Sequence, residues 1–130
     1  MIDSIHADVQ SVEVTGQANS YQFNVQVSSP DTGCDQYADW WEVISEEGDL
    51  IYRRILLHSH VSEQPFTRSG GPVATGANET IWVRAHMNNN GYGGDSFKGS
   101  IANGFVKTTM DPSFAIDLEK EEPLPKDCAF

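Results

Sequence analysis

The sequence has no long apolar run and no sustained helical pattern. None of its 130 residues lies in a stretch close to the roughly 18 apolar residues that a membrane-spanning helix needs. No window keeps helical hydrophobic periodicity for three turns, whereas Val, Ile, Phe, Tyr and Trp recur in short alternating segments. These features predict an all-β domain that is not embedded in a membrane.

Lysine and arginine are absent from the first 52 residues, which contain ten of the 19 acidic residues. The formal net charge of the whole chain is −11. Because nucleic acids and anionic lipids are bound through clustered Lys and Arg, this composition predicts no nucleic-acid partner. The acidity is explained either by a need for solubility or by binding of cations or a basic partner.

Catalytic signatures are also missing. The chain contains no G-x-S-x-G, no H-E-x-x-H and no phosphate-binding P-loop, and Cys34 has no marked histidine partner. The sequence therefore predicts a protein that is not an enzyme and that needs no cofactor.

Cysteine is scarce: Cys34 and Cys128 are the two in the chain, 94 positions apart. Cys128 lies in an acidic, proline-containing tail, residues 111–130, that follows a predicted β-sandwich domain at residues 1–110. An even cysteine count and this placement predict a disulfide that ties the tail back to an early loop, and hence an extracellular or periplasmic location. Two free thiols in a cytosolic protein are the alternative.

The strongest hairpin signal lies within residues 39–60. Two apolar segments flank Glu46-Glu47-Gly48, where glycine suits the left-handed position of a short loop. Alternation assigns Trp41 and Val43 to one face of the first strand, with Trp40 and Glu42 on the other. We expect Arg53 and Arg54, in the second strand, to point to opposite sides.

Other segments extend the β pattern. Residues 21–29 alternate apolar and polar side chains, and so do residues 80–87. The apolar phase changes between Val9 and Val12, which predicts a bulge or a strand that passes between sheets. About seven short strands joined by turns predict an immunoglobulin-like antiparallel β-sandwich.

One part of the sequence resembles a known family. Ile81-Trp82-Val83-Arg84-Ala85, followed by Asn88-Asn89-Asn90-Gly91-Tyr92-Gly93, is similar to the F strand and the F–G loop of fibronectin type III domains. Phe23 stands where that family usually has a core tryptophan, and the tail that contains Cys128 is extra. The resemblance implies a sandwich used for binding or spacing.

A shared outer face is the leading candidate for function. Aromatic and charged side chains on adjacent strands, with the glycine-rich loop beside them, have the composition of a protein or carbohydrate contact site. The predicted binding residues are Trp40, Glu42, Trp82, Arg84, His86, Asn90 and Tyr92. Alternatively, the tail covers this face and makes it a second, internal core.

The histidines suggest a second function, a metal-binding protein. His58 and His60 lie two residues apart and point the same way in an extended segment, and His86 would join them if its strand lies on the same sheet. Three imidazoles would suit zinc or copper. Asp31, Asp35 and Asp39 raise the weaker option of a calcium site, with a solvated acidic loop as its alternative.

Overall fold

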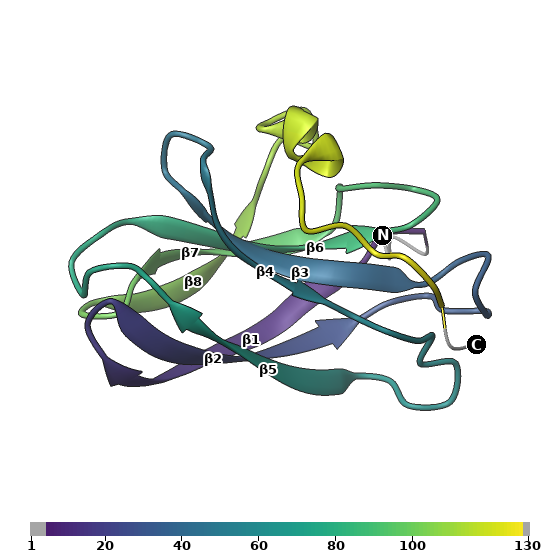
Figure 1. Cartoon of the computed structure of the whole chain (residues 1–130), viewed down its shortest axis with the longest axis horizontal. Coiled ribbons are helices and arrows are strands. Elements are labelled where there is room, and N and C mark those ends of the chain that lie inside the picture. The colour runs from purple at the N-terminus through teal and green to yellow at the C-terminus, as the bar shows by residue number, and fades with distance from the viewer. Residues whose placement is uncertain (1–4, 129–130) are drawn as a thin grey trace.

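The computed structural model describes residues 5–128, which form two antiparallel β-sheets followed by a short 3₁₀ helix (Figure 1). The elements are β1 (Asp8–Gln17), β2 (Ser20–Ser28), β3 (Ala38–Ser45), β4 (Leu50–Ile55), β5 (Phe66–Val73), β6 (Ile81–Met87), β7 (Asp95–Ser100), β8 (Gly104–Thr109) and η1 (Ile116–Lys120). The strand order is β1-β2-β5 in one sheet and β4-β3-β6-β7-β8 in the other. The predicted all-β sandwich is confirmed, with eight strands instead of about seven.

The main core lies between the two sheets and follows the predicted alternation. Tyr21 and Phe23 of β2 are buried together with Trp41 and Val43 of β3. β6 contributes its own inward row, Ile81, Val83, Ala85 and Met87. Burying these large apolar side chains is the main favourable term for the fold.

Local irregularities also lie where the sequence indicates them. The pairing of β1 with β2 shifts between Val9 and Ser11, so the phase change is a bulge. Gly48 has a φ of 100° in the turn between β3 and β4, as its place in a short hairpin loop requires. A Cβ on Gly48 would lie 3.3 Å from the Ala115 side chain, so this turn also contacts the tail.

The tail is an ordered third layer. In Figure 1 the yellow segment after β8 rises over the outer face of the five-stranded sheet, forms η1 and returns above β3 and β4. Leu118, the buried residue of η1, joins Ile44 of β3 and Met110 in a second apolar cluster. Within residues 5–128, no helix is both long and apolar enough to cross a membrane.

Candidate functional site

Glu42 is at the centre of a buried charged network on the outer face of β3. Its Oε1 accepts a 2.8 Å hydrogen bond from Arg53 Nε, and its Oε2 accepts one of 2.7 Å from Arg84 Nε. The Tyr92 hydroxyl donates to the same Oε2 at 2.8 Å. One carboxylate thus joins β4, β6 and the loop after β6, and two arginines compensate its charge.

The two arginines also hold the tail. Arg53 Nη2 donates to the Leu118 carbonyl at 2.8 Å, and its Nη1 donates to the carbonyl of Glu121 at 2.6 Å. Arg84 Nη1 donates to the Phe114 carbonyl at 2.7 Å. Because every planar guanidinium offers five donors, each arginine can bind Glu42 on one edge and tail backbone on another.

The predicted contact face is therefore inside the molecule. Trp40 is 2% exposed and Arg84 is 1% exposed, Glu42 is fully buried, and Trp82 is half-buried beside Phe114. The prediction that this face is presented to a partner is wrong, because the tail occupies it. The alternative, a second internal core beneath the tail, is confirmed.

The two predicted loop residues are not free contact groups either. Tyr92 is 6% exposed, and Arg84 lies over its ring at 3.6 Å from the centroid. Asn90 is half-buried, and its Nδ2 donates to the Ile5 carbonyl at 3.1 Å. Both residues fix the loop after β6 to the rest of the fold.

His86 connects the sheet to the tail through two carboxylates. Its Nδ1 lies 2.6 Å from Asp39 Oδ1, and its Nε2 lies 2.7 Å from Glu119 Oε2. Its ring stacks on Trp40 with a centroid separation of 3.8 Å, while Arg53 covers Trp40 at 4.1 Å. A neutral imidazole has one N–H and one acceptor nitrogen, so two hydrogen bonds need one of two arrangements. Either an imidazolium donates to both carboxylates, or one carboxyl group is protonated and donates to the acceptor nitrogen.

A cavity of about 480 Å³ opens beside this histidine, between the sheet and the last described part of the tail. The Cys34–Cys128 disulfide forms part of its wall, so the predicted bond exists and borders the cavity. The other lining residues are Tyr37, Asp39, Trp40, His86, Asn88, Glu119, Leu124, Pro125, Lys126 and Asp127.

Burial and nearby charges change the pKa of two groups of this cavity. Burial raises the pKa of Asp39, although the hydrogen bond and the charge of His86 lower it in part. Burial also raises the pKa of the Tyr37 phenol, and the nearby Asp39 and Asp31 carboxylates add to the effect. The Tyr37 hydroxyl therefore keeps its proton at neutral pH and can both donate and accept a hydrogen bond.

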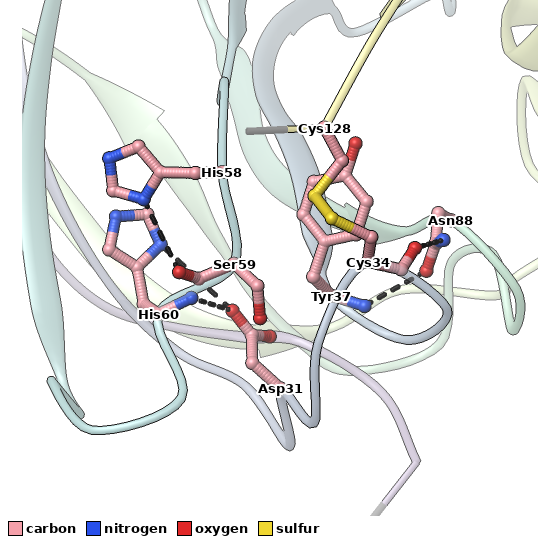
Figure 2. Close-up of a disulfide and its surroundings, with 8 residues drawn as sticks. All are labelled: Asp31, Cys34, Tyr37, His58, Ser59, His60, Asn88 and Cys128. Carbon is pink, nitrogen blue, oxygen red and sulfur yellow. Dashed lines mark hydrogen bonds and ion pairs between the residues drawn. A yellow bond between two sulfur atoms is a disulfide. The ribbon is translucent and has the colours of Figure 1, made fainter. Parts of the chain in front are cut away.

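His58 and His60 lie elsewhere, in the connection between β4 and β5. Figure 2 shows the two imidazoles side by side and Asp31 accepting from the His60 backbone N–H. The two ring centroids are 4.6 Å apart. His60 is 4% exposed and stacks on Phe66 at 3.8 Å. His86 has a different set of partners, Asp39 and Glu119, so the structure does not assemble the predicted trio.

No group of three or more His, Cys, Asp or Glu side chains within residues 5–128 is arranged to hold a metal ion. Asp31, from the weaker calcium option, has hydrogen bonds from three protein donors. Its carboxylate accepts from Ser29 Oγ at 2.7 Å, Ala38 N at 3.0 Å and His60 N at 2.8 Å. Asp31 is therefore buried, and its hydrogen bonds hold the surrounding loop in place. It is not the solvated residue that the alternative to a calcium site predicted.

Sequence reasoning missed three residues of the site: Arg53, as the partner of Glu42, and Tyr37 and Glu119 at the cavity. It named Asp39 only as a candidate calcium ligand, not as a partner of His86. For Arg53 the hairpin register carried a usable signal, because it places Arg53 opposite Glu42. For Asp39 alternation from Glu42 gave none, because it assigns Asp39 to the opposite face. Glu119 had no such signal, since it lies in a tail whose docking position depends on long-range contacts.

Comparisons with known proteins find a relative by sequence similarity. No family model matches the chain, and no solved structure matches it. A protein of Halomicrobium mukohataei that is named "Putative lipoprotein" is 41% identical over 88 residues, which is 65% of this chain and 43% of that protein. The chain thus spans less than half the length of this relative.

Proposed function

We propose that this chain is an exported, non-enzymatic binding domain of the cell envelope, and that the cavity beside the disulfide holds a carbohydrate. The observation that carries the proposal is the cavity itself. Its volume of about 480 Å³ lies within the roughly 300–1,000 Å³ typical of small-molecule sites. Its polar side chains come from both the sheet and the tail.

Two observations support export. The Cys34–Cys128 disulfide is the kind of bond that persists in oxidising compartments outside the cytoplasm. The Halomicrobium relative carries a lipoprotein name, which fits a protein held at the envelope. We therefore place this chain outside the cytoplasmic membrane.

The immunoglobulin-like assignment is part of the same proposal. The first, second and fifth strands share one sheet, while the third, sixth and seventh share the other, as in immunoglobulin sandwiches. We assign no catalysis to the buried network, because Glu42, Arg53 and Arg84 bind one another and the tail backbone. Domains of this architecture commonly serve for binding, although fold alone does not define the ligand.

The chemistry of the lining favours a neutral, hydroxyl-rich ligand. Asp39, Glu119 and Asp127 provide carboxylate acceptors that would repel an anion. Tyr37 and Lys126 add donors, so the cavity mixes the two hydrogen-bonding roles that sugar hydroxyls also combine. The stacked faces of Trp40 are occupied by His86 and Arg53, so recognition would be mainly polar.

The test is a titration of the isotope-labelled protein with a panel of neutral mono- and disaccharides, in which NMR chemical shifts of the backbone amides report binding. Saturable shifts around the cavity are expected. Lys126→Ala and Asp127→Ala should weaken binding about tenfold each, since both side chains are exposed and line the cavity. Lys120→Ala and Glu122→Ala, exposed on the same tail but outside the cavity, are the matched controls.

Absence of saturable shifts across the panel would contradict the carbohydrate proposal. Equal effects of all four variants would show that the sugar does not bind in the cavity. Export is tested separately by treating intact cells and lysed cells with a thiol reagent, with and without reductant. Finding reduced Cys34 and Cys128 in cells would contradict the envelope location.

A further inference from the structure

A second cavity, of about 80 Å³, lies where the edges of the two sheets meet. Its lining consists of Arg54 of β4, Arg68 of β5, and Leu56, Leu57, His58 and His60 of the connection. Arg54 joins the sheets directly, because its Nε donates to the Ser69 carbonyl of β5 at 2.8 Å. The site is therefore built by elements that the fold already holds together.

We propose that this cavity is a binding site for a small oxyanion: a phosphate, sulfate or carboxylate group, either free or at the end of a larger ligand. The inference goes beyond the carbohydrate cavity and rests on different residues. Within residues 5–128, four of the six lining side chains are arginine or histidine and none is acidic, in a chain whose net charge is −11. The charge of this lining is thus opposite in sign to the net charge of the whole molecule.

Both guanidinium groups are held in place by backbone carbonyls. Arg54 donates from Nε to Ser69 and from Nη1 to Ile55, and Arg68 Nη1 donates to the Thr67 carbonyl at 2.8 Å. A guanidinium has five N–H donors, so these bonds orient each group and leave further donors. Oriented guanidinium groups recognise oxyanions through paired, charge-assisted hydrogen bonds.

His60 is buried and holds the Arg68 guanidinium at the cavity. Its Nε2 lies 2.9 Å from Arg68 Nη2, and since arginine can only donate, Nε2 is the acceptor and the ring proton is on Nδ1. That buried Nδ1 has no hydrogen-bond partner among residues 5–128, and its distance to Asp31 Oδ2 is 3.9 Å. This N–H lies on the side of the Asp31 carboxylate, so His60 acts at the cavity through Nε2, which orients the Arg68 guanidinium.

In the described part of the chain, the acidic side chains that pair with His60 or Arg68 are Asp31 and Glu63, and both are already engaged. Asp31 accepts hydrogen bonds from Ala38 and His60 backbone N–H groups, and Glu63, with a side chain 60% exposed, pairs with Arg68 at 3.2 Å. The cavity volume of about 80 Å³ is well above the roughly 10–15 Å³ that one water needs, so the cavity has room for a small ion.

The experiment is a calorimetric titration of the whole chain at low ionic strength with sodium phosphate, sodium sulfate and sodium acetate. We expect saturable binding of at least one anion, and the three salts distinguish tetrahedral oxyanions from carboxylates. Arg54→Gln and Arg68→Gln should each weaken it about tenfold. Glu63→Gln should tighten it, because it removes the carboxylate that competes for Arg68. Lys107→Gln, a half-exposed cation on β8, should leave it unchanged.

The arginine variants should weaken anion binding and Glu63→Gln should tighten it, so a general loss of folding cannot produce the expected result. Because Glu63 is exposed, its variant should fold even if Arg54→Gln does not. Wild-type affinity in Glu63→Gln together with wild-type affinity in Arg68→Gln would overturn the proposal, as would no saturable binding of any of the three anions. An equal loss in Lys107→Gln would also overturn it, since it would show only general charge attraction.

Discussion

Glu42 and Arg84 are directly paired across β3 and β6, and Arg84 Nε donates a 2.7 Å hydrogen bond to Glu42 Oε2 with both side chains almost fully buried. The sequence places both side chains on a shared outer face of adjacent strands, and the leading prediction leaves that face exposed. Exposed cross-strand pairs contribute about 0.2–1 kcal/mol. Burial changes the energetics, because removal of one partner leaves the other charge uncompensated in a poorly solvated place.

Glu42→Gln should therefore lower the free energy of unfolding by about 3–5 kcal/mol. The variant removes the charge that compensates both Arg53 and Arg84 while it keeps a similar shape. Urea denaturation measures the change. Glu46→Gln is the matched control on the neighbouring turn, where an exposed carboxylate lies 3.6 Å from Lys98, and it should change stability by less than about 0.5 kcal/mol. Similar losses in the two variants would contradict a buried network.

Leu118→Ala tests whether the tail is part of the folded core. Leu118 is 5% exposed and packs with Ile44 and Met110, so its truncation should cost about 2–3 kcal/mol. Ile116→Ala, in the same short helix but 49% exposed, should change stability by less than about 0.5 kcal/mol. Thermal unfolding of the two variants measures the difference. Two small effects would mean that the tail adds little to stability.

Strand alternation was sufficient to predict most of the sandwich. Tyr21 and Phe23 are buried, and Trp41 and Val43 fill the core between the sheets, as their two-residue spacing indicates. The disulfide was also predictable, because two cysteines allow one pairing within a chain. These features depend on local periodicity or on a count, both of which are visible in one sequence.

The covering of the outer face was predictable only as an alternative. The same side chains suit either a contact surface or a core, and they are Trp40, Glu42 and Arg84. Once such charged groups are buried they need partners, whether another molecule or the chain's own tail covers them. The partners that decide the matter are backbone carbonyls of the tail, which accept from Arg84 and Arg53; the Leu118 carbonyl, for example, lies 65 positions from Arg53. Every residue has a carbonyl, so such acceptors leave no pattern in the sequence.

Removal of the disulfide should release the end of the tail first. Cys34→Ser with Cys128→Ser opens a bond that spans 94 positions, for which the chain-entropy argument gives an upper value of about 4–5 kcal/mol. We expect faster tryptic cleavage after Lys120 and Lys126, because the local opening energy of the tail falls. Cleavage after Lys107, in β8, is the internal control. Mass spectrometry of timed digests measures all three sites, and equal acceleration at Lys107 would indicate global destabilisation instead.

Acid should weaken the fold partly through His60. Burial, followed by the positive charges of Arg68 and His58, lowers the pKa of His60 below its ordinary value of 6.5. Between the two pKa values the unfolded chain binds more protons than the folded one, so stability falls as the pH drops below about 6.5. His60→Gln removes this titration, and its free energy of unfolding should change less with pH than that of the wild type across this window. Leu118→Ala, destabilised by a different route, should keep the wild-type slope. Urea denaturation at several pH values measures the slopes, and an unchanged slope in His60→Gln would show that other groups cause the acid sensitivity.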